Sequence, residues 1–131
     1  MSRHAAELAV DSRCALGECI LWCQRRGALF WADITGCRLW MYRPDSGEIR
    51  HWDVPAPLGC FALCEDDRLL LGLAKALYLA DPDRSAGATL EIRHVADVEA
   101  DLAHTRINDG RADRHGNFVF GTKSERKDAA E

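Results

Sequence analysis

The sequence lacks the features that would place the protein in a membrane or on a nucleic acid. No apolar run approaches the roughly 20 residues that a membrane-spanning helix needs, and residues 1–7 have no apolar core typical of a secretory signal. The formal net charge is -4, and the basic residues are scattered apart from Arg126-Lys127. Neither nucleic acid nor an anionic membrane is therefore an expected partner, and we expect a cytoplasmic protein.

Short motifs for metal, phosphate or nucleophilic chemistry are also missing. No two of the six cysteines form a C-x-x-C pair, and the five histidines show no H-x-x-x-H spacing. There is no glycine-rich phosphate loop and no Ser-His-Asp order. A reducing cytosol disfavours disulfides, and a free cysteine within an apolar run behaves as a small buried hydrophobe. We therefore expect packing roles for the cysteines in such runs, which are Cys19, Cys23, Cys60 and Cys64.

Short apolar runs separated by turn residues begin at Cys19, and they show no helical period. The length of 131 residues and the 47% hydrophobic content suffice for one ordinary globular domain. Pro44-Asp45-Ser46-Gly47 is a strong hairpin signal with a glycine available for positive φ. The pattern predicts an all-β fold whose first four strands are 20–23, 28–32, 38–42 and 49–54.

The same four-strand pattern then repeats over 60–64, 69–73, 77–80 and 90–95. The segments Glu48–Trp52 and Glu91–Val95 have nearly the same sequence and lie 43 residues apart. A period of about 40–50 residues with four short strands is typical of β-propeller blades. We expect one partial propeller domain over residues 1–131, with one blade at about 17–54, a second at about 59–96 and a third beginning at about 106.

Two and a half blades cannot close a ring, and ring closure is how a propeller removes its edge strands. We therefore expect either a piece of a longer protein or a chain whose edges are completed by another chain. The second possibility predicts self-association through the open blade edges.

Four motifs in the same order resemble the amino-terminal part of the SMP-30/gluconolactonase family, also called regucalcin-like. They are Leu16-Gly17-Glu18, Gly27–Ile34, Pro44–Glu48 and Thr105–Asp113, and the resemblance extends to Thr122. It implies a six-bladed β-propeller, of which this chain holds about two and a half blades. It also implies hydrolysis of a sugar lactone with one divalent metal ion, Ca²⁺, Zn²⁺ or Mn²⁺, at the mouth of the central channel.

The resemblance implies roles for three residues of this chain. Glu18 matches a metal ligand, and Arg106 and Asn108 match residues that contact the substrate. The family's other two protein ligands, an asparagine and an aspartate that also transfers a proton, would lie beyond Glu131. The resemblance therefore implies an incomplete metal site, no catalytic residue within this chain and impaired activity. The sequence also departs from the family, because Cys19-Ile20 follows the glutamate where Gly-Pro is usual.

Residue types alone leave a plainer interpretation open for each position. Glu18 could be a solvated glutamate at a blade edge, and Arg106 could be a surface arginine. Asn108-Asp109-Gly110 could be only a strand-entry turn, since these residues are favoured there. The four tryptophans are expected to pack in the core rather than to form a stacking platform. At the level of the whole chain, the alternative to an enzyme is a non-catalytic propeller piece used in binding or assembly.

Overall fold

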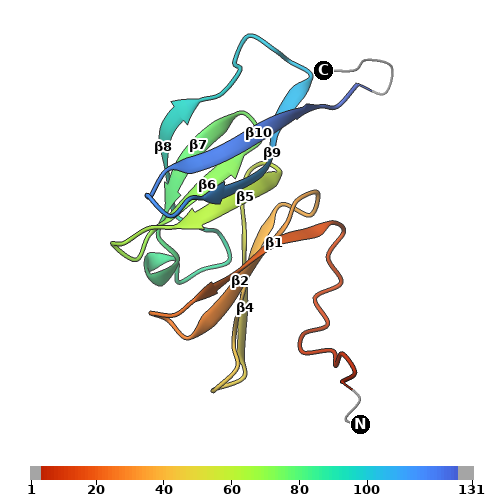
Figure 1. Ribbon diagram of the computed structural model, residues 1–131, viewed down its shortest axis with the longest axis vertical. Coiled ribbons are helices and arrows are strands. Elements are labelled where there is room, and N and C mark those ends of the chain that lie inside the picture. Colours follow the sequence, from red (N-terminus) through yellow and green to blue (C-terminus); the bar gives the residue numbers. More distant parts are fainter. Residues whose placement is uncertain (1–3, 127–131) are drawn as a thin grey trace.

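Two four-stranded antiparallel sheets and one two-stranded hairpin follow one another along the chain (Figure 1). The computed structural model describes residues 4–126. The first sheet contains β1 (Gly17–Cys23), β2 (Ala28–Asp33), β3 (Arg38–Arg43) and β4 (Glu48–Asp53). The second contains β5 (Leu58–Leu63), β6 (Leu69–Leu73), β7 (Ala76–Ala80) and β8 (Ile92–Asp97), and the hairpin contains β9 (Thr105–Ala112) and β10 (Phe118–Ser124). The prediction of an all-β fold is confirmed.

Strand order within each sheet equals sequence order, so each sheet is an up-and-down meander. Glycines complete two of the turns where the backbone enters the left-handed region, with φ of 60° at Gly27 and 76° at Gly47. In the described part of the chain, the one helical element is η1 (Pro82–Arg84), a short 3₁₀ turn between β7 and β8. Within residues 4–126, no helix is long and apolar enough to cross a membrane.

The main hydrophobic core lies between the two four-stranded sheets. Alternation along β2 places Ala28, Phe30 and Ala32 on the face that packs against the second sheet, and all three are fully buried. Leu69 and Leu71 of β6 supply the opposing layer and are equally buried. Burying a side chain the size of leucine or phenylalanine stabilises a fold by about 1.5–3 kcal/mol. The two sheets are therefore held together mainly by these interleaved side chains.

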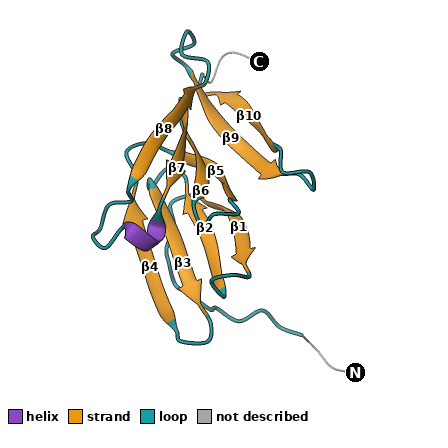
Figure 2. Ribbon diagram, turned by 90° about the vertical axis from the view of Figure 1, so that its left-hand side faces the viewer, coloured by secondary structure: helices purple, strands orange, loops and turns teal. Residues whose placement is uncertain are grey.

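Two arginines of the β1–β2 turn add polar links between the sheets. Arg25 pairs with Asp67 at 2.7 Å, and Arg26 pairs with Asp83 at 2.9 Å. The Arg26 side chain is only 7% exposed, and its guanidinium also lies 5.7 Å from the centre of the Phe30 ring. These ion pairs link the β1–β2 turn to the β5–β6 turn and to η1, which is the purple coil in Figure 2.

The tryptophans divide between the core and the outer face of the first sheet. Trp52 is 1% exposed and lies in the core, so the prediction of core packing is confirmed for Trp52. Trp40 is 9% exposed but lies on the outer face, because its neighbours Leu39 and Met41 face the core. Trp31 stacks on Trp40 with ring centres 5.8 Å apart and planes within 9°. The prediction is wrong for Trp22, which is 50% exposed. The reason is strand alternation: Cys23 of β1 faces inward, so the neighbouring Trp22 faces outward.

Candidate functional site

A β-bulge interrupts each of the three strands that open a sheet or hairpin. On β1 the register shifts between Glu18 and Leu21, and on β5 it shifts between Leu58 and Cys60. On β9 the shift falls between Ile107 and Gly110, opposite Phe120 and Thr122 of β10. An extra residue in one strand bends it and re-aims nearby side chains. All three predicted site residues lie at or beside these bulges.

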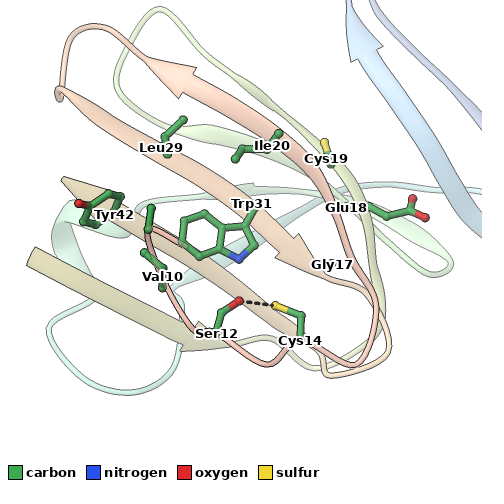
Figure 3. Close-up of a pocket in the computed structure, with 11 residues that line it drawn as sticks. Val10, Ser12, Cys14, Gly17, Glu18, Cys19, Ile20, Leu29, Trp31 and Tyr42 are labelled. Carbon is green, nitrogen blue, oxygen red and sulfur yellow. Dashed lines mark hydrogen bonds between the residues drawn. The ribbon is translucent and has the colours of Figure 1, made fainter. Parts of the chain in front are cut away.

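Glu18 is the second residue of β1, paired with Ala32 of β2. Its side chain is exposed, and the carboxylate points away from the sheet face occupied by Trp31 (Figure 3). Cys19, the next residue, has a φ of 57° in the left-handed region. That conformation costs a residue other than glycine of the order of 1 kcal/mol or more. The chain therefore carries local strain immediately beside Glu18.

Arg106 and Asn108 lie on β9 and contact each other. The Arg106 side chain donates from Nη1 to the Ile107 carbonyl oxygen at 3.0 Å and to Asn108 Oδ1 at 3.4 Å. Arg106 is 6% exposed, so the alternative of a surface arginine is wrong. Because the amide oxygen of Asn108 accepts from the guanidinium, the amide nitrogen is the group with which Asn108 can donate. The pair therefore offers N–H donors at the start of β9.

Asn108-Asp109-Gly110 lies inside β9, so the alternative of a strand-entry turn is also wrong. The three residues form the bulged part of the strand. Asp109 Oδ1 accepts a hydrogen bond from the Gly110 backbone N–H at 2.9 Å. A Cβ at Gly110 would stand 2.6 Å from Phe120 Cβ, so only glycine fits this close packing. A bulge selects the same small and polar residues that a turn selects.

The structure brings both predicted stretches against β5. Cys19 Sγ lies 3.8 Å from the Phe61 carbonyl oxygen of β5, and the Ile107 carbonyl of β9 abuts the same strand at Gly59. Cys19 and Asp109 both contribute to the raised pKa of Cys60, so the two stretches come near each other at this strand. Among residues 4–126, Glu18 has no hydrogen bond or ion pair to Arg106 or Asn108.

The residues described here do not assemble a metal site. No group of three or more histidine, cysteine, aspartate or glutamate side chains in residues 4–126 is arranged to hold a metal ion. Glu18 is a suitable ligand type for a hard cation such as Ca²⁺, which takes six to eight oxygen atoms. One carboxylate supplies only a small part of that set, so the donor set present does not fit a complete metal site.

A cavity of about 380 Å³ lies over the outer face of the first sheet. Val10, which precedes β1, covers it from one side, and Leu29, Trp31 and Tyr42 form its floor (Figure 3). Glu18 borders this cavity, but its carboxylate points out of it. The cavity is therefore separate from the surface that Arg106 and Asn108 present.

The thiol of Cys60 is expected to be inert in the folded protein. Burial raises the pKa of Cys60 to about 12, and the neighbouring Cys19 and Asp109 add to the effect. Since the thiolate is the reactive form, only about one Cys60 in ten thousand is ionised at pH 8. With iodoacetamide at that pH, mass spectrometry should show Cys37 alkylated in the native protein and Cys60 only after unfolding. Equal rates at the two positions would contradict the burial of Cys60.

The backbone roles of two positions in this region were not predicted from the sequence. Cys19 was noted only as a packing residue and as a departure from the family's usual glycine, and cysteine itself does not favour positive φ. Gly59 did carry a signal, since an isolated glycine within a strand pattern indicates a bulge or a close approach of another backbone. The structure shows a close approach at Gly59, with the Ile107 and Asn108 carbonyls packed against it.

Comparison with known proteins gives two closely matching lactonases. The chain is 46% identical to the L-arabinolactonase of Azospirillum brasilense over 121 residues, which covers 92% of this chain and 38% of that protein. It is 37% identical to the 6-deoxy-6-sulfogluconolactonase of Pseudomonas putida over 107 residues, covering 82% of this chain and 35% of that protein. The chain thus spans less than two fifths of the length of these relatives.

A solved structure and a family sequence model agree with these matches. The structure of regucalcin, a calcium-binding protein from Agrobacterium tumefaciens, aligns with a TM-score of 0.78 at 24% identity, covering 92% of this chain and 39% of that one. The fold is therefore part of a propeller of the SMP-30 type, as predicted. The sequence model of the SMP-30/Gluconolactonase/LRE-like region matches residues 16–131. The chain belongs to the SMP-30/gluconolactonase/LRE-like family.

Proposed function

We propose that this chain is part of a metal-dependent sugar-lactone hydrolase, with Arg106 and Asn108 as its substrate contacts and Glu18 as one metal ligand. The observation that carries the proposal is the Arg106–Asn108 pair, held by hydrogen bonds at the start of β9. The lactonases among its relatives support the class of substrate, a small sugar lactone. We further propose a single partial-propeller domain over residues 1–131, with blades at about 17–54 and 59–96 and a third from about 106.

The chemistry of the pair suits an oxygen-rich ligand. The Asn108 amide nitrogen can donate to a hydroxyl or ring oxygen, because its amide oxygen is engaged by Arg106. The planar Arg106 guanidinium has further N–H groups that can donate to a carbonyl or carboxylate oxygen of the same ligand. Both residues thus bind and orient a sugar lactone, and neither is placed to transfer a proton.

Metal dependence requires ligands other than those described here. Glu18 alone cannot hold Ca²⁺, Zn²⁺ or Mn²⁺ tightly, since these ions take at least four ligands in proteins. The chain on its own is therefore expected to hydrolyse lactones little faster than buffer does, because its metal site is incomplete.

The test is lactone hydrolysis combined with ligand binding. When the chain is mixed with L-arabinono-1,4-lactone and Ca²⁺, Zn²⁺ or Mn²⁺, the rate of lactone hydrolysis should stay near background. In a separate binding titration, L-arabinonate should shift the Asn108 side-chain NMR signal. Asn108→Ala should abolish binding, followed through the Arg106 Nε–H signal that this variant retains, and Glu65→Gln, at an exposed turn, serves as the control. The absence of any shift in the wild-type chain would contradict the substrate contacts. Robust turnover that Glu18→Gln abolishes would instead refute the proposed impairment.

A non-catalytic role in binding or assembly is the second candidate. Ile20 is 59% and Trp22 is 50% exposed on the same face of β1, and apolar side chains exposed together favour association. This candidate is expected to give self-association through the open blade edges. Light scattering coupled to size-exclusion chromatography should then show oligomers that Trp22→Ser weakens, and a monomer at all concentrations would count against it.

A further inference from the structure

Gly59 stands at the point where β5 and β9 come closest. A Cβ built on Gly59 would lie 2.3 Å from the Ile107 carbonyl oxygen and 2.8 Å from that of Asn108. Its φ is not among the positive values of the described glycines, so other residues could adopt its backbone conformation. Space alone excludes a side chain here, and the atoms that fill the space are backbone rather than flexible side-chain ends.

The carbonyl that meets Gly59 is also the acceptor that holds Arg106. Arg106 Nη1 donates to Ile107 O at 3.0 Å and to Asn108 Oδ1 at 3.4 Å. On the other side, the Ile107 N–H donates to Ala74 O at 2.7 Å. Ile107 is fully buried, so it is fixed from both sides. A shift of its carbonyl would break the hydrogen bond that aims Arg106 and, through Arg106, the Asn108 amide.

We propose that Gly59 is a positioning residue for substrate binding, acting through the Ile107 carbonyl on Arg106 and Asn108; this rests on the proposed function. The bulge at the start of β5 supplies no side chain to the site. Its contribution is the bare backbone on which the bulge of β9 rests. The second sheet thereby sets the geometry of Arg106 and Asn108, the proposed substrate contacts on the β9–β10 hairpin.

The test compares three glycine-to-alanine variants. Gly59→Ala forces backbone atoms of β9 to move. Gly72→Ala is the matched packing control, because its Cβ would instead meet Ile107 Cγ2 at 2.8 Å and Cys60 Sγ at 2.9 Å, both side-chain atoms. Gly121→Ala on β10 is the neutral control, with nothing within 4 Å of its Cβ. Each variant is studied where circular dichroism shows it fully folded.

The primary readout is the NMR spectrum without ligand. Gly59→Ala is expected to move the Arg106 Nε–H and Asn108 side-chain signals, whereas Gly72→Ala leaves both in place even where it lowers the melting temperature. In titrations with L-arabinonate, Gly59→Ala should weaken binding by about 10- to 100-fold, the effect expected when one hydrogen bond from a charged group to the ligand is lost. Gly72→Ala and Gly121→Ala should bind like the wild type.

The outcomes separate this inference from the proposed function. Wild-type binding and unmoved signals in Gly59→Ala overturn the positioning role. If the wild-type chain does not bind L-arabinonate, the proposed substrate contacts fail, while the ligand-free spectra still decide whether Gly59 sets the Arg106–Asn108 geometry. If Gly59→Ala does not fold, the test uses the NMR spectrum of the wild-type chain. Nuclear Overhauser contacts between the Gly59 Hα protons and Asn108 are then expected, and their absence overturns the inference.

Discussion

Replacing Trp52 with alanine is expected to lower the free energy of unfolding by about 3–5 kcal/mol, the usual cost of deleting a large buried aromatic side chain. Trp52 is 1% exposed and packs in the core between the first two sheets. Its Nε1 donates to the Ser85 carbonyl oxygen at 2.9 Å, and the Arg50 guanidinium lies 4.6 Å from its ring centre. The substitution therefore removes packing and a hydrogen bond that fixes the β7–β8 loop on β4.

Urea unfolding followed by circular dichroism measures this loss. Trp52→Phe retains most of the packing but removes the donor to Ser85, so it should cost less than the alanine variant. Trp22→Ala is the control for the loss of an indole, and at 50% exposure it should change stability by less than about 1 kcal/mol. A loss below about 1 kcal/mol in Trp52→Ala would contradict the placement of Trp52 in the core.

Asp33→Asn is expected to cost about 2–3 kcal/mol, because a buried carboxylate there accepts three backbone hydrogen bonds. Its oxygens accept from the N–H groups of Ala15, Leu16 and Gly36 at 3.0, 3.0 and 3.1 Å. An amide in its place turns an NH₂ group toward at least one of these donors. The substitution should release the segment that precedes β1, which hydrogen exchange at the Ala15 and Leu16 amides would report.

The same carboxylate gives a pH dependence of defined sign. Burial alone raises the pKa of Asp33, but the hydrogen bonds from Leu16, Ala15 and Gly36, with the charge of Arg38, outweigh it and lower the pKa below its ordinary value. A lowered pKa in the folded state stabilises the protein above the unfolded-state value of about 3.9. This stabilisation is lost as the pH falls through the folded-state pKa. Unfolding curves for wild type and Asp33→Asn should therefore converge in acid, and a constant gap would contradict this.

The repeat made the fold accessible from the sequence. The nearly identical short sequences around Ile49 and Ile92 predicted two equivalent outer strands. The structure pairs His51 with Trp40 of the neighbouring strand in the first sheet and His94 with Tyr78 in the second. Strand pairing follows sequence order, so local patterns were enough. The exposure of side chains was harder to predict. Trp22 is a residue type common in protein cores, but the register of β1 decides which face of the sheet it occupies.

The candidate site was predicted by position but not by geometry. The motif around Asn108 was recognisable, yet its residue types suit a turn and a bulge equally, so its place inside β9 could not be read from them. The burial of Arg106 depends on the packing of β9 against β5, which no local pattern reports. The left-handed backbone at Cys19 likewise belongs to the β1 bulge, between the paired residues Glu18 and Leu21, and goes against the preference of the residue itself.

The meander order of the strands has a kinetic consequence. Because each strand pairs with its sequence neighbour, the loops that must close are short and their entropic cost is small. Chains rich in such local contacts cross lower topological barriers during folding. Each four-stranded sheet can thus form its hydrogen-bonded ladder from pairings between sequence neighbours, without first needing contacts with the other sheet.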